Sequence, residues 1–274
     1  MPPNAIILME KEETKLPVVS YSKVTTYKDC PKKYKFAYID KLPRVDKHYT
    51  IFGSFCHEVL EKFHKHYLEE KETLPFVDVM QQSFKQAREN WKEKITKDQL
   101  TEAYAIMLKY LMLVTEQSKE EAPDILSVEK KIWIPIEDEF IFYGFIDRVQ
   151  RDKDGMLHVG DYKTTKDPKY LKDRTQLLLY GYALLVEDDK LKTLRSSYIL
   201  LKHDLKPMIA EHDVSELIEA KDKFVESWRK IKNDKLFRPT PIFWKCNMCD
   251  YVNHCKEGQK LIFSNKKTYG KISW

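Results

Sequence analysis

The residues best suited to phosphate chemistry occur near the middle of the chain, where Asp147, Asp161 and Lys163 stand in segments of strand-like composition. Asp161 and Lys163 are two positions apart, so a strand places both side chains on one face. On its own, a carboxylate beside an ammonium group on a strand is typical of a surface ion pair, which stabilises a protein little. The interpretation therefore depends on what lies next to this pair.

Asp147 belongs to the run YGFIDRVQ, whose hydrophobic residues make an unpaired charge expensive to bury. The dipeptide Asp154-Gly155 predicts a hairpin turn that brings Asp147 beside Asp161. Two carboxylates so close repel each other unless a divalent cation lies between them, and Mg²⁺ and Mn²⁺ prefer oxygen ligands. The sequence thus predicts a Mg²⁺ or Mn²⁺ site, with Lys163 within reach of an attacking water and a phosphate.

The elements that position these residues are predicted from hydrophobic periodicity. Phe55, Val59, Phe63 and Tyr67 recur every four residues and predict a helix over Phe52–Glu70. An earlier helix is predicted to be capped by Ser22 and bent at Pro31. Further helices are predicted at 76–96, 98–119, 170–186 and 214–232, and strands at 125–136, 139–151, 156–164, 194–202 and 208–213.

This order of elements predicts one α/β domain over residues 20–274, after an N-terminal extension of residues 1–19. The domain has three expected parts: a helical part at about 52–120, a catalytic core at about 125–213, and a cysteine module at about 240–260 joined to Cys30.

Composition narrows the class of protein. Of the 274 residues, 42% are hydrophobic and 33% charged, which allows a buried core and is unlike a disordered chain. No apolar run approaches the roughly 20 residues that span a bilayer, and no secretory signal is visible. We therefore expect a soluble, cytoplasmic protein without a membrane partner. The net charge of +5 permits a nucleic-acid partner without requiring one, and the chain lacks the phosphate-binding loop of a helicase motor.

The pattern resembles the PD-(D/E)xK nuclease superfamily, with Asp147 as the motif aspartate and Asp161-Tyr162-Lys163 as D-x-K. Its context is similar to the RecB-like branch. The strand around Asp147 resembles G-x-I-D-R-hydrophobic, Gln176 and Tyr180 match Q-x-x-x-Y, and His57 matches the upstream G-x-x-x-H helix. The resemblance implies a restriction-endonuclease-like core, which is a mixed central sheet flanked by helices, here with a helical insertion and a C-terminal iron–sulfur cysteine module.

By this resemblance, one or two Mg²⁺ or Mn²⁺ ions are held by His57, Asp147, Asp161 and the main-chain carbonyl of Tyr162. Lys163 is the catalytic lysine, and the products carry 5′-phosphate and 3′-hydroxyl ends. Gln176 and Tyr180 are expected to contact DNA or the lysine, with helix packing against the sheet as the alternative. Glu129 resembles a further acidic position of the family, although the adjacent Lys130 and Lys131 fit an exposed strand pair equally well.

Three of the five cysteines are clustered near the C-terminus, as Cys246-x₂-Cys249 followed by Cys255, a spacing that indicates a metal site in need of a fourth ligand. Four thiolates suit Zn²⁺ or an iron–sulfur cluster, and free thiols are the remaining alternative. With Cys30 in Tyr-x-x-Cys-Pro, the arrangement is similar to the iron–sulfur RecB-type nucleases, which include AddB-type helicase–nuclease subunits and CRISPR-associated adaptation exonucleases. This resemblance implies a [4Fe–4S] cluster on Cys30, Cys246, Cys249 and Cys255.

Together these features predict a metal-dependent DNA exonuclease that acts on single-stranded DNA or DNA ends. It would work alone or with a separate helicase, recombination or adaptation partner. A second hypothesis is a nuclease fold that binds DNA without cutting it, against which the presence of Asp147, Asp161 and Lys163 argues. A third, a cysteine-rich zinc regulator, predicts a colourless protein rather than a brown one.

Overall fold

The computed structural model describes residues 15–44, 47–69, 74–116, 122–165 and 167–269, so residues 1–14 of the predicted N-terminal extension lie outside the described residues. The chain divides into two compact units. Lys47–Asp222 makes up most of the first, which we call the core unit. Pro17–Asp46 and Lys223–Trp274 make up the second, which we call the cysteine unit.

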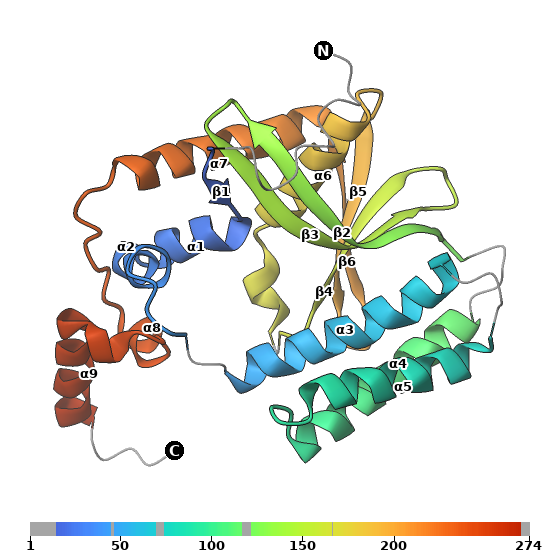
Figure 1. The fold of residues 1–274 in the computed structure, drawn as a ribbon, viewed down its shortest axis with the longest axis horizontal. Helices are drawn as coiled ribbons and strands as arrows, with labels where there is room; N and C mark the ends of the chain where they lie inside the picture. The colour runs from blue at the N-terminus through green and yellow to red at the C-terminus, as the bar shows by residue number, and fades with distance from the viewer. Residues whose placement is uncertain (1–14, 45–46, 70–73, 117–121, 166, 270–274) are drawn as a thin grey trace. The chain divides into compact units, whose positions relative to one another are not determined.

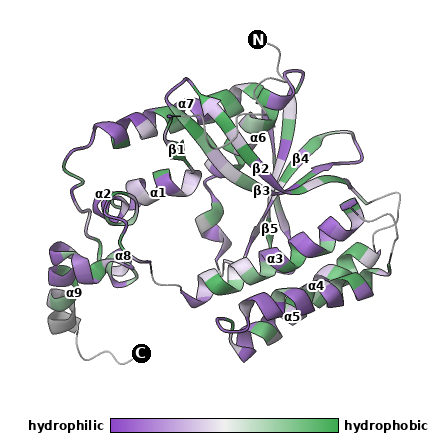
Figure 2. Ribbon diagram, in the orientation of Figure 1, coloured by the Kyte–Doolittle hydropathy of each residue, from purple (hydrophilic) through white to green (hydrophobic). Residues whose placement is uncertain are grey.

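Three helices form one layer of the core unit (Figure 1): α3 (His48–Glu69), α4 (Phe76–Trp91) and α5 (Lys97–Glu116). The predicted stripe of α3 is confirmed, because Phe55, Val59 and Phe63 are at most 1% exposed. Figure 2 shows hydrophilic and hydrophobic residues alternating along α4 and α5, as expected of helices with one buried face.

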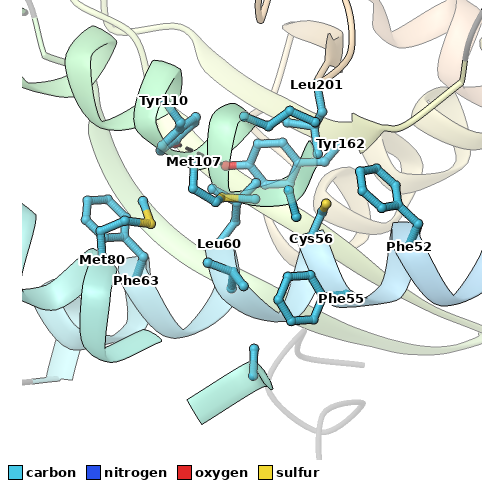
Figure 3. Close-up of a cluster of buried hydrophobic side chains, with 14 of the residues drawn as sticks. Phe52, Phe55, Cys56, Leu60, Phe63, Met80, Met107, Tyr110, Tyr162 and Leu201 are labelled. Atoms are coloured by element: carbon cyan, nitrogen blue, oxygen red, sulfur yellow. Dashed lines mark hydrogen bonds between the residues drawn. The ribbon is translucent and has the colours of Figure 1, made fainter. Parts of the chain in front are cut away.

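A hydrophobic cluster joins this helical layer to the sheet. Figure 3 shows Phe55, Leu60 and Phe63 of α3 packed with side chains of α4 and α5, and Tyr162 of the sheet lies at the same cluster. Each fully buried side chain of this size contributes about 1.5–3 kcal/mol through the hydrophobic effect. The cluster therefore fixes the position of α3 against the strand that carries Tyr162.

The core unit has a mixed sheet. Its strands β2 (Asp124–Ile136), β3 (Phe140–Arg151) and β4 (Leu157–Lys163) are consecutive and antiparallel. Strand β5 (Thr193–Leu200) runs parallel to β4, and β6 (Pro207–Asp213) is antiparallel to β5. Gly155 adopts a φ of +84° in the predicted turn between β3 and β4, a conformation that glycine takes without steric cost. The predicted fold class, a mixed central sheet flanked by helices, is confirmed.

The connection between the parallel strands contains a short 3₁₀ helix, Pro168–Leu171, and α6 (Thr175–Glu187). The sequence predicted one helix from Tyr170, but the 3₁₀ helix ends at Leu171 and α6 begins only at Thr175. A Cβ at Gly181 would lie 2.5 Å from a methyl group of Leu194, so α6 packs too closely against β5 for a larger residue. Helix α7 (Val214–Asn233) follows the sheet and contains the boundary between the two units.

The cysteine unit contains short elements from both ends of the chain. These are β1 (Val18–Val19), α1 (Tyr21–Asp29), α2 (Pro31–Tyr34) and a π-helical turn (Lys35–Ile39), with α8 (Phe243–Asn247), a 3₁₀ turn (Val252–His254) and α9 (Lys256–Tyr269). The predicted break at Pro31 is confirmed. The predicted cap is wrong: Ser20, not Ser22, caps α1, because its hydroxyl accepts the backbone N–H of Lys23.

In the part of the chain described here, no helix combines the length and apolar content that crossing a membrane requires.

Candidate active site

The hairpin of β3 and β4 brings Asp147 and Asp161 to neighbouring positions. Arg148 pairs with Gly160, so the two aspartates follow on adjacent strands. Beyond this pair the strands diverge, and the Asp147 Oδ2 accepts a hydrogen bond of 2.7 Å from the backbone N–H of Tyr162. The carboxylate of Asp147 therefore takes the place of a backbone acceptor in the ladder. The expected approach of the two acidic residues is confirmed.

Helix α3 supplies His57 to the same point. The His57 Nε2 donates a 2.8 Å hydrogen bond to the carbonyl of Tyr162, and its Nδ1 lies 3.4 Å from the Asp147 Oδ2. Gly53, one turn earlier, allows this approach, because a Cβ there would lie 3.1 Å from the Thr164 hydroxyl. Burial alone would lower the pKa of His57, but Asp147 and Asp161 outweigh burial and raise it to about 9.

Strand β2 adds a third carboxylate. The pairing of Val128 with Arg148 places Glu129 opposite Asp147, and Glu129 has a φ of +46°, which a non-glycine residue rarely adopts. Ligand atoms of His57, Glu129 and Asp147 all lie within 4.8 Å of one another. Burial, with the nearby carboxylate of Asp147, raises the pKa of Glu129 to about 7. One imidazole nitrogen and two carboxylate oxygens suit Mn²⁺ or Mg²⁺.

Asp161 lies outside that group of three and pairs with the lysine of its own strand. Its Oδ2 is 2.6 Å from the Lys163 Nζ, and the residue is 2% exposed. Burial raises the pKa of Asp161, and Asp147 raises it further, while Lys163 opposes both. The Asp161 carboxylate therefore interacts electrostatically with Asp147 and His57, and its ion pair holds the Lys163 ammonium group near them.

Helix α6 contacts the lysine from the other side. The Lys163 Nζ donates a 3.3 Å hydrogen bond to the Gln176 Oε1, and the Gln176 Nε2 donates one of 2.8 Å to the Tyr180 hydroxyl. Gln176 therefore contacts the lysine, which is one of the roles that the sequence left open. The Tyr180 ring lies 3.3 Å from the point where a Cβ on Gly144 would be, so Tyr180 also packs on the sheet.

Sequence reasoning missed a buried network behind Tyr162. Its hydroxyl lies 3.3 Å from each of the Tyr110 hydroxyl, the His64 Nε2 and the Arg148 Nη1. The Tyr110 hydroxyl is also 2.6 Å from the His64 Nε2. Burial, with the nearby Arg148, lowers the pKa of His64 to about 3, so this imidazole stays neutral. The signal in the sequence was that His64 lies seven residues, or two helical turns, after His57 on the buried side of α3.

The group of His57, Glu129 and Asp147 lines an open cavity of about 620 Å³ in the core unit. Other side chains of its wall include Tyr49, Glu61 and Lys62. The wall residue Glu58 is held in place, because its carboxylate accepts 2.6 Å hydrogen bonds from Asn90 and from the Trp91 indole. The cavity thus offers an entrance to the group from solvent.

Comparison with known families places these motifs. The family model of the PD-(D/E)XK nuclease superfamily matches residues 18–256. The chain belongs to this superfamily. No curated protein matches the sequence. Among solved structures, a protein from Eubacterium rectale described as a putative exonuclease is 14% identical, with a TM-score of 0.46, over 86% of this chain and 87% of that chain. SSO0001 is 14% identical, with a TM-score of 0.32, over 83% of this chain and 95% of that chain.

In this PD-(D/E)XK nuclease the four cysteines predicted to share a ligand all belong to the cysteine unit, and none forms a disulfide. A Cβ at Gly258 would lie 3.6 Å from the sulfurs of both Cys246 and Cys255, so these two thiols approach one point. Burial raises the pKa of Cys249 and of Cys255, and Cys30 raises both further, which indicates that Cys30 lies near them.

The cysteines nevertheless do not form a tight ligand group. Within the described residues, no set of three potential ligand atoms within 4.8 Å includes a cysteine sulfur. The iron–sulfur cluster is therefore not shown. The fifth cysteine, Cys56, packs in the hydrophobic core, and its burial raises the pKa of the thiol to about 12.

Proposed function

We propose that this nuclease hydrolyses DNA phosphodiester bonds as a Mg²⁺- or Mn²⁺-dependent exonuclease acting on single strands or DNA ends. The observation that supports it is the convergence of His57, Glu129 and Asp147 beside the buried pair of Asp161 and Lys163. Glu129 thereby joins the ligands expected from sequence. We further propose that Asp161 and the Tyr162 carbonyl complete the site when DNA is bound.

Each residue has a distinct task in the proposed reaction. A divalent cation held by His57, Glu129 and Asp147 would polarise the scissile phosphate and lower the pKa of a bound water molecule. His57 must lose one proton to act as a ligand; loss from Nδ1, which lies 3.4 Å from the Asp147 Oδ2, leaves the Nε2 hydrogen bond to the Tyr162 carbonyl in place. The Lys163 ammonium, held by Asp161 and Gln176, orients the attacking water and stabilises negative charge on the pentavalent phosphorus.

For the cysteine unit we propose a [4Fe–4S] cluster on Cys30, Cys246, Cys249 and Cys255. A tetrahedral Zn²⁺ site with Zn–S bonds of about 2.3 Å would bring the sulfurs to about 3.8 Å from one another. Among the described residues, no three ligand atoms that include a cysteine sulfur lie within 4.8 Å of one another, so the proposal of the cluster is supported by the cysteine spacing and the resemblance and not by sulfur distances. A brown protein with absorbance near 400 nm and bound iron supports this proposal, whereas a colourless protein with one zinc contradicts it.

The function is tested with single- and double-stranded DNA labelled at the 5′ or 3′ end, incubated with Mn²⁺ or with EDTA. We expect Mn²⁺-dependent shortening from an end, and at least a 100-fold slower reaction in Asp161→Ala and Lys163→Ala with DNA binding largely retained. Lys109→Ala, which removes an exposed ion pair with Asp204, is the matched control and should cleave normally. DNA binding by the wild type without any cleavage would favour the non-cutting alternative. Addition of a separate helicase then tests whether the nuclease depends on a partner that unwinds DNA.

A further inference from the structure

The hairpin of β2 and β3 continues past Glu129 and Asp147 with a run of aromatic and basic side chains. Lys131 pairs with Phe145, and Trp133 pairs with Tyr143. We call these four residues the aromatic strip. Phe145 is two positions from Asp147, and Lys131 is two positions from Glu129. Because a strand rises about 3.4 Å per residue, the strip begins about 7 Å along the hairpin from the metal ligands.

The strip forms one contiguous surface. The ring centroids of Trp133 and Tyr143 are 5.7 Å apart, and those of Tyr143 and Phe145 are 5.4 Å apart. Phe145 is 40% exposed, whereas its neighbours Ile132 and Ile146 on the other face of the hairpin are at most 3% exposed. The strip is therefore the face of the hairpin that the hydrophobic core does not use.

The strip also contains a positive charge, on Lys131, that is available to a partner. The Lys131 ammonium lies 5.3 Å from the centroid of the Trp133 ring, and no carboxylate among the described residues pairs with it. By contrast, the Nζ of the adjacent Lys130 lies 3.1 Å from a carboxylate oxygen of Glu187. An ammonium group over a partly exposed ring suits a partner that offers both negative charge and flat apolar surfaces.

We propose that the aromatic strip binds the single-stranded segment of the substrate immediately beside the scissile phosphate. Exposed rings stack on nucleic-acid bases, and an unpaired lysine binds the phosphate backbone. Only an unpaired strand presents free base faces, since a duplex keeps them stacked inside. The proposal rests on the proposed nuclease function, because the continuity of the strip with the metal ligands is what assigns its occupant to the substrate.

The test measures binding of a labelled oligothymidine, and of a duplex of equal length, in EDTA so that no cleavage occurs. Phe145→Ala removes a ring on which a base can stack. It should therefore weaken single-strand binding about 10- to 100-fold and duplex binding much less. Phe145→Tyr keeps the ring and should bind within about twofold of the wild type. Oligothymidine should change the tryptophan fluorescence of the wild type, and this change should be smaller in Trp133→Phe.

Tyr104→Ala removes an equally exposed aromatic side chain, 47% exposed, from α5 and is the matched control. Unchanged single-strand affinity in Phe145→Ala, an equal loss for the duplex, or no single-strand binding by the wild type would overturn the assignment of the strip. These results are separable from failure of the nuclease proposal, which appears as absence of cleavage when Mn²⁺ is added. Where cleavage occurs, Phe145→Ala should raise KM for single strands while kcat changes little.

Discussion

The two candidate metal-binding regions of this molecule differ in how far the fold itself positions the ligands. In the core unit, the ligand atoms of His57, Glu129 and Asp147 lie within 4.8 Å of one another. Backbone groups of Tyr162 bind both Asp147 and His57, and the Tyr162 ring is part of the hydrophobic cluster. Any movement of these ligands would therefore disturb buried packing.

In the cysteine unit, the ligands stand on short elements with little burial. Helix α8 has five residues and none of them is buried. The contacts of α8 and of the segment before it are near the surface: Lys245 pairs with Asp29 at 2.9 Å, and the Thr240 hydroxyl donates to the carbonyl of Asp29 at 2.9 Å. Exposed interactions of this kind contribute little stability. The difference teaches that the fold by itself gathers the ligand atoms of the first site, whereas it does not gather the thiols of the second as closely among the described residues.

The largest effect that this comparison predicts follows from removing one of the cysteines proposed to hold the cluster. With the proposed cluster bound, Cys249→Ser should release it, and the cysteine unit should lose its structure, since structural metal sites contribute on the order of 10 kcal/mol to the domains they hold. Hydrogen exchange should show lost protection in residues of the cysteine unit but not in α3 or β3. Cys56→Ala, the matched control, should keep the absorbance and the bound iron. Equal protection of both units in Cys249→Ser would contradict the comparison.

The next effect concerns Glu129 and has opposite signs for metal binding and for stability. Its pKa is raised from 4.5 to about 7, so ionisation destabilises the metal-free fold progressively as pH rises from the unfolded value and fully above about 7. Glu129→Gln should therefore stabilise the metal-free protein at pH 8 by about 1–2 kcal/mol, allowing for solvent screening. The same variant should bind Mn²⁺ at least about 100-fold more weakly. Denaturant unfolding with EDTA and titration with Mn²⁺ measure the two effects.

A variant that loses stability and metal binding together would show that Glu129 is a structural residue rather than a ligand. Glu61→Gln provides a control, because Glu61 lines the same cavity without belonging to the group of three. It should change Mn²⁺ affinity much less than Glu129→Gln does.

The sequence predicted the part of the site that follows from local rules. The turn at Gly155 fixes the register of β3 and β4, and register decides which residues are opposite each other, so the approach of Asp147 and Asp161 was predictable. The role of Glu129 as an acidic site residue was only one of two alternatives, because hydrophobic patterning does not reveal the φ of +46° that this residue adopts. The network of Tyr162 with His64 and Tyr110 depends on how α3 and α5 pack, which no local pattern specifies.

In the cysteine unit, by contrast, the long-range grouping of residues was predicted and a local detail was not. Spacing and resemblance pointed to a shared ligand for Cys30 and the three C-terminal cysteines, and the structure brings these segments into one unit. The cap of α1 was misassigned, because Ser20 and Ser22 are both good capping residues and only the backbone geometry distinguishes them. Neither the sequence nor the structure decides between zinc and an iron–sulfur cluster, since the same thiolates suit both.

The pH dependence of Mn²⁺ affinity is the third prediction. His57 has a pKa of about 9 and Glu129 a pKa of about 7 in the metal-free protein, and both must be deprotonated to act as ligands. Affinity should therefore rise with pH, by up to about tenfold per pH unit between 7 and 9, and level off above. Calorimetry in buffers of different ionisation enthalpy should detect proton release at pH 8. The absorbance of the cysteine unit should not change over this range, and an affinity independent of pH would contradict the ligand role of His57.

The smallest predicted effect comes from the hydroxyl of Tyr162, which ties the core-unit site to the helices. Tyr162→Phe keeps the ring and both backbone hydrogen bonds, but it removes one partner each from Arg148, Tyr110 and His64. Leaving buried polar groups with fewer partners costs about 1–3 kcal/mol of stability. Because the strand is still held by the hydrophobic cluster, Mn²⁺ affinity should fall only by about 3- to 10-fold. Tyr27→Phe in the cysteine unit removes a comparable hydroxyl, which donates to Asp234 at 2.7 Å, and it should leave Mn²⁺ affinity unchanged. If both variants weaken Mn²⁺ binding alike, the two regions are not independent and the comparison fails. If neither does, the backbone of Tyr162 positions the ligands without help from its side chain.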